Sequence, residues 1–181
     1  MEKIGIIGSG TWGTAIAVLL VNNGHEVTLW SAIPAEIEEM AKTRTHKNLP
    51  GVTLPEGLVY TADLEKAMAD KDLLVMAVPS VFVRSTAQKM KPFCKDGQLI
   101  VDVAKGIEEN TLDTMTQIIK EELPMAETAV LSGPSHAEEV SRGLPTTCVA
   151  GARTRKTAEK IQNLFMSPVF RVYISPDILG I

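Results

Sequence analysis

The chain has 181 residues, of which 45% are hydrophobic and 22% are charged, which suits one folded domain with a buried core and excludes a disordered or fibrous protein. Its formal net charge of −4, without a local block of Lys and Arg, excludes a nucleic-acid-binding surface. Because Cys94 and Cys148 lack a CxxC spacing and the apolar run 15–21 is too short to cross a bilayer, we expect a cytoplasmic location without a disulfide scaffold, a metal site or membrane insertion.

Short apolar runs alternate with amphipathic stretches in the first part of the chain. In chain order they predict a strand at 4–7, a helix at 14–23, a strand at 27–30, a helix at 34–42, a strand at 58–60 and a short helix that Asp63 caps. Gly24 suits the left-handed conformation that often ends a helix. Residues 45–57, rich in Pro and Gly, predict a loop before the third strand.

The same alternation continues through the rest of the chain. It predicts a strand at 73–78, a helix at 81–91, a strand at 99–103, a helix at 111–123, strands at 128–131 and 147–150, a helix at 154–166 and a strand at 169–174. Strands that alternate with helices indicate parallel pairing, right-handed crossovers and helices on both faces. We therefore predict an α/β protein with a Rossmann-type, doubly wound and mostly parallel sheet over residues 1–174.

A glycine motif lies between the first predicted strand and the first predicted helix. Gly8, Gly10 and Gly13 match G-x-G-x-x-G. In this motif the first glycine permits a tight turn, the second lets the backbone approach a pyrophosphate, and the third lets the helix pack closely on the strand. The helix start adds free N–H groups and the positive end of the helix dipole. The strand–turn–helix context predicts a dinucleotide-binding site rather than a glycine-rich turn without a ligand.

The residues after the second predicted strand bear on which nicotinamide cofactor binds. An acid at this place binds the ribose hydroxyls of NAD, whereas an Arg accommodates the 2′-phosphate of NADP. This chain has Ser31, Ala32 and Ile33 there, and neither Glu26 nor Glu36 is an obvious substitute. Because no cation is placed in the sequence to hold an extra phosphate, we expect NAD or NADP with a preference for NAD.

Three further strand ends carry residues suited to chemistry, since ligands of doubly wound sheets bind beyond the carboxyl ends of strands. Pro79 either forms a wall of a nicotinamide site or simply ends its strand. Lys105 either faces an anionic or carbonyl-bearing substrate or is a plain surface lysine. The turn at 132–136 offers N–H groups and the Ser135 hydroxyl to a phosphate.

The three histidines have no role that the sequence predicts. His136 lies in the turn just described, but no Asp or Ser can be identified as its partner, and Glu138 and Glu139 do not form a metal-ligand pattern with it. His25 and His46 lie in predicted turns, and we expect both to be solvated.

Several segments together carry a resemblance to a known family. They read GSGTWGTA at 8–15, AVPS at 77–80, AKGIE at 104–108, LSGPSHAEEV at 131–140, PTT at 145–147 and FRVYISPDILGI at 170–181. They extend over the whole chain, which resembles the bacterial NAD(P)-dependent glycerol-3-phosphate dehydrogenases. The resemblance implies a cytoplasmic, usually homodimeric enzyme that interconverts sn-glycerol 3-phosphate and dihydroxyacetone phosphate by hydride transfer, in glycerophospholipid synthesis.

The resemblance also implies roles for individual residues by their position. It implies cofactor contacts at Thr11, Trp12, Lys105 and Ala137, and substrate contacts at Lys105, Gly133 and Ser135. The family commonly has basic residues after the second strand, where this chain has Ala32 and Ile33. That departure argues against a preference for NADP.

In this family an all-helical domain follows, and its first helix carries the lysine that moves the hydroxyl proton. We expect that lysine beyond Ile181, with residues 175–181 beginning the connection to the helical domain, so the chain alone should show negligible turnover. Two alternatives remain open. One is a stand-alone NAD(H)-binding sensor module, and the other is a dehydrogenase of similar fold that acts on a different hydroxy acid or a sugar acid.

Overall fold

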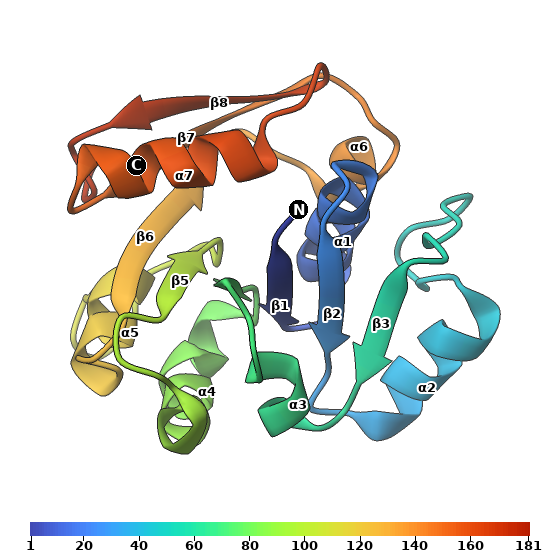
Figure 1. Cartoon of the computed structure of the whole chain (residues 1–181), viewed down its shortest axis with the longest axis horizontal. Coiled ribbons are helices and arrows are strands. Elements are labelled where there is room, and N and C mark those ends of the chain that lie inside the picture. Colours follow the sequence, from blue (N-terminus) through green and yellow to red (C-terminus); the bar gives the residue numbers. More distant parts are fainter.

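The computed structural model describes residues 1–181 and contains a single sheet of eight strands (Figure 1). The strands are β1 Lys3–Ile7, β2 Glu26–Trp30, β3 Leu58–Thr61, β4 Leu73–Met76, β5 Leu99–Asp102, β6 Glu127–Ser132, β7 Thr146–Ala152 and β8 Phe170–Ser175. Their order is β3-β2-β1-β4-β5-β6-β7-β8, and the six strands from β3 to β6 are parallel. This order of six parallel strands is that of a doubly wound sheet, so the predicted fold class is confirmed.

Seven α-helices connect or flank the strands (Figure 1). They are α1 Thr11–Asn22, α2 Pro34–Thr43, α3 Leu64–Met68, α4 Ser80–Met90, α5 Met115–Glu122, α6 Ala137–Ser141 and α7 Arg155–Phe165. A single 3₁₀ turn, Lys91–Phe93, follows α4 and contains Pro92. The longest helix has 12 residues, and none has the length and apolar character needed to span a bilayer.

Two helix starts differ from the prediction by three or four residues, each for a local reason. α1 begins at Thr11 rather than at residue 14, because the Gly10 carbonyl already accepts the Thr14 N–H at 2.9 Å. α5 begins at Met115 rather than at residue 111, because Thr114 and Gln117 form a capping box that fixes its first turn.

The direction of β7 departs from the parallel pattern that the alternation of strands and helices indicates. β7 pairs with β6 in antiparallel fashion, and β8 then pairs parallel to β7 after the crossover helix α7. A parallel connection needs a helix that crosses the sheet between neighbouring strands. The short α6 instead packs against α1, so the chain turns back and β7 runs opposite to β6.

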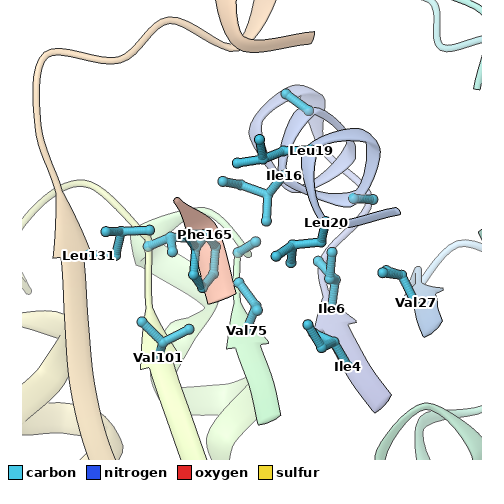
Figure 2. Close-up of a cluster of buried hydrophobic side chains, with 14 of the residues drawn as sticks. Ile4, Ile6, Ile16, Leu19, Leu20, Val27, Val75, Val101, Leu131 and Phe165 are labelled. Carbon is cyan, nitrogen blue, oxygen red and sulfur yellow. The ribbon is translucent and has the colours of Figure 1, made fainter. Parts of the chain in front are cut away.

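The core forms two layers, one on each face of the sheet. Successive strand residues alternate between them: Ile6 belongs to the layer that contains residues of α1, α2, α6 and α7, whereas Ile7 belongs to the layer that contains residues of α3, α4 and α5. Figure 2 shows the first layer, where α1 side chains approach side chains of the central strands and of α7; the residues are Ile16, Leu19, Leu20, Val75, Val101 and Phe165. The two layers hold the carboxyl ends of the parallel strands at one rigid edge.

Candidate functional site

A cleft of about 310 Å³ lies at the carboxyl ends of β1, β4, β5 and β6. Four separate segments of the chain line it, and the lining residues are Gly10, Thr11, Trp12, Ala77, Val78, Pro79, Ser80, Ala104, Lys105, Ser135, His136 and Ala137. Seven of these are residues that the sequence marked as cofactor or substrate contacts. The structure therefore brings together in one place the predicted residues that follow four different strands.

The three motif glycines have different structural roles. Gly8 has a φ of +123°, and a Cβ there would lie 2.7 Å from the Ala77 carbonyl carbon. A Cβ on Gly13 would overlap the Gly8 carbonyl oxygen, so these two glycines build the turn without lining the cleft. Gly10 has a φ of −62°, which any residue adopts, and a Cβ there would meet no atom within 4 Å. The protein itself therefore does not require glycine at position 10, and the open space above Gly10 fits a ligand.

The first turn of α1 has free hydrogen-bond donors beside this open space. The N–H groups of Thr11, Trp12 and Gly13 donate to no protein acceptor, and Gly10 supplies no side-chain cap. No acidic side chain lies in this turn to satisfy the positive end of the helix dipole. Free donors next to a residue without a Cβ match the needs of a pyrophosphate, so the site fits the dinucleotide that the motif predicts.

Lys105 lies at the centre of contacts that join three of the lining segments. Its Nζ donates to the Gly133 carbonyl oxygen at 3.0 Å and lies 5.8 Å from the centre of the Trp12 ring. Trp12 in turn donates its Nε1–H to the Val103 carbonyl oxygen at 3.0 Å. The ammonium therefore stands at the cleft with two of its three protons free for a ligand.

The turn after β6 packs tightly on β7. A Cβ on Gly133 would lie 2.6 Å from the Thr147 carbonyl oxygen, so Gly133 lies outside the cleft lining and contributes its carbonyl to Lys105. Ser135 is buried, and its hydroxyl donates to the Gly133 carbonyl oxygen at 3.3 Å. Burial raises the pKa of the nearby Cys148 thiol, which keeps it protonated beneath the turn.

Asp102 is a buried acid beside the site that the sequence gave no reason to select. It ends β5 and is 3% exposed, and its carboxylate accepts the Ala104 N–H at 2.9 Å and the Thr116 hydroxyl at 3.2 Å. Burial raises its pKa to about 7, although both hydrogen bonds act in the opposite direction. Asp102 holds the turn that presents Lys105. The available signal was an acid that ends an otherwise apolar strand three residues before that lysine.

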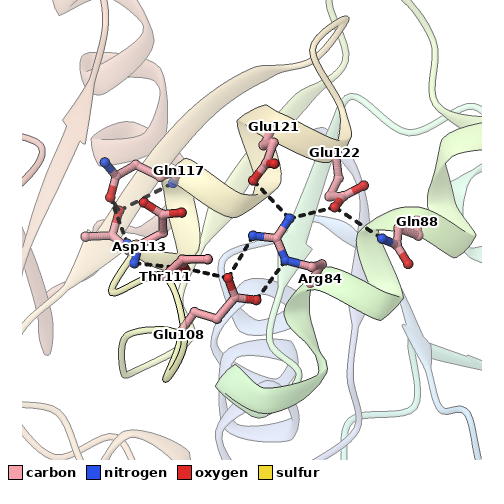
Figure 3. Close-up of polar contacts among 9 residues, drawn as sticks. Arg84, Gln88, Glu108, Thr111, Asp113, Gln117, Glu121 and Glu122 are labelled. Atoms are coloured by element: carbon pink, nitrogen blue, oxygen red, sulfur yellow. Dashed lines mark hydrogen bonds and ion pairs between the residues drawn. The ribbon is translucent and has the colours of Figure 1, made fainter.

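A cluster of charged residues holds the segment that follows Lys105 (Figure 3). Arg84 of α4 donates two hydrogen bonds of 2.7 Å to Glu108, and it also pairs with Glu121 at 2.9 Å and Glu122 at 2.7 Å. The Arg84 guanidinium and the Thr111 hydroxyl hold the pKa of Glu108 down at about 2. The cluster fixes the segment between β5 and α5 against α4.

The expectation that His46 is solvated is wrong. Its side chain is 8% exposed; Nδ1 accepts the Asn48 N–H at 3.1 Å, so Nε2 carries the proton and donates to the Ser9 carbonyl oxygen at 3.2 Å. Burial lowers the pKa of His46. Asn48 also donates to the Thr11 hydroxyl at 3.1 Å, so residues 44–57 are attached to the glycine loop. The turn predicted around His46 gave no indication of this attachment.

The expectation that His25 is solvated is also wrong, because this ring joins two ends of the fold. It is half-buried, accepts the Glu2 N–H on Nδ1 at 3.3 Å and contacts the Leu164 carbonyl oxygen through Nε2 at 3.2 Å. His136 lines the cleft at the start of α6, and no hydrogen bond of its ring is present.

The end of β2 carries neither acid nor base, but a cation lies nearby that sequence reasoning missed. Ser31 is buried and Ile33 is 53% exposed, directly after the strand. Lys47, from residues 44–57, places its Nζ 2.8 Å from Glu36 Oε1 in the first turn of α2. Glu36 and Lys47 are too far apart in the sequence to be neighbours within one helix or strand, so only the folding of the loop brings them together.

Comparison with known proteins identifies the relatives of the chain. Residues 3–158 match the family model described as NAD-dependent glycerol-3-phosphate dehydrogenase N-terminus. The chain is 59% identical over 181 residues to a glycerol-3-phosphate dehydrogenase of Agathobacter rectalis, covering 99% of this chain and 54% of the relative. A second such enzyme, of Fusobacterium nucleatum, is 52% identical and is covered to 55%. The chain thus spans about half the length of the curated relatives it matches.

A solved structure has the same fold. The crystal structure of a glycerol-3-phosphate dehydrogenase from Coxiella burnetii superposes with a TM-score of 0.93 and is 29% identical, with 99% of this chain and 55% of that chain covered.

Proposed function

The chain belongs to the NAD-dependent glycerol-3-phosphate dehydrogenase family, and on that basis we propose that it is the dinucleotide-binding part of an enzyme that interconverts sn-glycerol 3-phosphate and dihydroxyacetone phosphate. The observation that carries the proposal is the pairing of two features in one cleft. Free N–H donors lie beside an open Gly10, and Lys105 lines the same cleft. One feature suits a pyrophosphate, and the other suits an anionic substrate.

In this proposal the chain's own groups bind and orient the dinucleotide. The N–H groups at the start of α1 donate hydrogen bonds to the pyrophosphate oxygens, and Gly10 lets the pyrophosphate approach the backbone. Trp12, Pro79 and Ala137 line the cleft where the nicotinamide end is held. The cofactor supplies the hydride chemistry when it is bound, and the protein supplies orientation and electrostatics.

Lys105 and the turn after β6 are proposed to receive the substrate. The Lys105 ammonium offsets the charge of a phosphorylated substrate and polarises the oxygen on its reacting carbon. The Gly133 carbonyl oxygen accepts a hydrogen bond from that ammonium at 3.0 Å, and Ser135 lines the same cleft. Both residues come from the turn that packs on β7, so the substrate groups share one rigid support.

The proposal extends to the organisation of the parent enzyme. Residues 1–174 form the dinucleotide-binding domain, and residues 175–181 begin the connection to a helical domain that carries the proton-transferring lysine. The span of about half of the curated relatives supports this division. The parent is proposed to be a cytoplasmic homodimer that serves glycerophospholipid synthesis.

The test is a calorimetric titration of the 181-residue chain with NADH, followed by an absorbance assay with glycerol 3-phosphate and NAD. We expect saturable NADH binding, an effect of glycerol 3-phosphate on that binding, and negligible turnover. A chain that binds no dinucleotide would overturn the proposal. A response to hydroxy acids in place of glycerol 3-phosphate would favour a different dehydrogenase, and robust turnover would mean that the proton-transferring group lies within residues 1–181.

A further inference from the structure

Lys47 lies in the part of the chain that is attached to the glycine loop. Its two neighbours make the attachment: His46 contacts the Ser9 carbonyl oxygen at 3.2 Å, and Asn48 donates to the Thr11 hydroxyl at 3.1 Å. Ser9 and Thr11 flank the glycine above which the pyrophosphate is proposed to bind. Lys47 is therefore held close to the dinucleotide site by contacts on both sides of it.

The Lys47 ammonium reaches the first turn of α2. Nζ donates to Glu36 Oε1 at 2.8 Å, and α2 begins at Pro34, shortly after β2 ends at Trp30. The ion pair thus connects the start of α2 with the loop 44–57, which His46 and Asn48 attach to the turn after β1. A cleft of about 470 Å³ lies beside the pair and is lined in part by Glu36, Lys47 and Met40.

Both partners of the ion pair keep unused hydrogen-bonding capacity. Glu36 Oε2 accepts no hydrogen bond, and Lys47 Nζ donates one of its three protons within the protein. The side chains of Lys47 and Glu36 are 72% and 43% exposed, so a ligand in the cleft can reach both. A carboxylate accepts hydrogen bonds from ribose hydroxyls and an ammonium binds phosphate, so the pair offers both functions at one place.

We propose that the Glu36–Lys47 ion pair sets the preference between NAD(H) and NADP(H) by contacting the 2′ position of the adenosine ribose. Glu36 accepts a hydrogen bond from the 2′-hydroxyl, whereas Lys47 pairs with a 2′-phosphate. The inference rests on the proposed function, because it requires the pyrophosphate to bind at the start of α1. In a doubly wound sheet the ribose of a dinucleotide held there lies at the end of the second strand, and Glu36 lies in the first turn of the helix that follows β2.

The two opposite charges predict weak discrimination in the native chain. Each side chain partly cancels the effect of the other on a 2′-phosphate, so NADH and NADPH are expected to bind within about tenfold of each other. Glu39 lines the same cleft and adds a second acid, and the neutral His46 ring adds no charge. Removing Lys47 therefore leaves acids alone beside the 2′ position, and neutralising Glu36 leaves the ammonium free.

The experiment titrates NADH and NADPH in parallel into the native chain and two variants. Lys47→Ala is expected to weaken NADPH binding about tenfold and to change NADH binding less than about twofold. Glu36→Gln is expected to act in the opposite direction, with NADPH binding about three- to tenfold tighter and NADH binding somewhat weaker. Opposite shifts of the NADPH:NADH affinity ratio are the signature of the pair.

Matched controls remove the same charges elsewhere. Lys95→Ala removes an exposed lysine that pairs with Asp70 at 3.2 Å, near the amino ends of β4 and β5, and Glu38→Gln neutralises an exposed acid on α2. Neither control should move the ratio. If both dinucleotides bind but Lys47→Ala and Glu36→Gln act like the controls, this inference is wrong and the proposed function stands. If neither dinucleotide binds to the native chain, both are wrong.

Discussion

At the scale of one residue, Gly10 is a glycine that the fold does not require but that a bound ligand would require. Its neighbours in the motif are fixed by packing, because a side chain on Gly8 or Gly13 would collide with backbone atoms. Gly10 faces open space and has an ordinary backbone conformation. A side chain at this position should therefore be tolerated by the fold and rejected by a bound pyrophosphate.

Gly10→Ser tests that distinction directly. Serine is a favourable residue before a helix, so the free energy of unfolding should change by less than about 0.5 kcal/mol. NADH affinity should fall at least about tenfold, because the side chain enters the pyrophosphate space and its oxygen competes for the free N–H groups. Urea unfolding and NADH titration measure the two effects. Gly13→Ala is the matched control and should lose stability instead, and unchanged NADH affinity in Gly10→Ser would contradict the assignment.

Asp102 predicts a pH dependence of stability. Burial raises its pKa to about 7 from an ordinary value of 3.8, so the folded chain keeps a proton that the unfolded chain releases. Stability from this group is therefore full below about pH 4 and falls as the pH rises toward 7. Asp102→Asn removes the charge and keeps the shape, so it should be roughly 2–4 kcal/mol more stable than the native chain at pH 8 and equal to it near pH 4.

Urea unfolding at these two pH values measures the difference. Asp96→Asn, at an exposed acid, is the control and should give no gain at pH 8. A loss of stability in Asp102→Asn at pH 8 would show instead that the fold depends on the ionised carboxylate as acceptor for Ala104 and Thr116.

The residues of the site differ in how well they could be predicted from the sequence. Gly8, Gly10, Gly13 and Lys105 stand at strand ends, where a motif or a lone charge is informative, and the cleft brings Gly10 and Lys105 together. Their assigned contacts with cofactor and substrate remain predictions. Asp102, His46 and Lys47 were missed for another reason: each makes a contact with a distant segment, at Thr116, Ser9 and Glu36, and local spacing does not encode such contacts.

At the scale of elements, the Arg84 cluster joins α4, α5 and the segment between β5 and α5. Arg84→Gln leaves three carboxylates close together without a cation, so the melting temperature should fall and the amides of residues 106–114 should exchange faster. The contribution of Glu108 is present above its ordinary pKa of 4.5 and is lost as the pH falls toward about 2. The deficit of the variant should therefore be larger at pH 7 than at pH 3.

Calorimetric melting and hydrogen exchange at the two pH values measure this effect. Arg155→Gln is the control, because Arg155 is 82% exposed and pairs only with Glu159, and its loss should matter little. An equal deficit at both pH values would show that Arg84 acts through packing and not through its carboxylates.

Element boundaries and strand directions were not equally predictable. The apolar runs located all eight strands, and the signal is plainest in central strands such as β4 and β5, which are buried along their whole length. The starts of α1 and α5 were missed by three and four residues, because caps at Gly10 and Thr114 decide them. The reversal at β7 had no local signal, since it depends on α6 packing against α1.

At the scale of the whole molecule, one sheet edge gathers segments that are distant in the chain. The ends of β1, β4, β5 and β6 supply the cleft, and residues 44–57 lie against its glycine loop. Parallel strands bring their carboxyl ends to one edge of the sheet, so the meeting of the first four segments was predictable without the strand order. The position of residues 44–57 against the glycine loop could not be predicted. A long loop without a periodic pattern of apolar residues does not indicate which part of the protein it contacts.

One of the two tryptophans forms part of the cleft wall, and the other, Trp30, is buried in the core. Trp12 thus serves as a built-in fluorophore, and reduced nicotinamide absorbs in the range where indole emits. Quenching of its emission can report occupancy in real time without any label. Replacing Trp30 with phenylalanine would leave Trp12 as the single tryptophan, so association and release could be followed by its emission in a stopped-flow instrument.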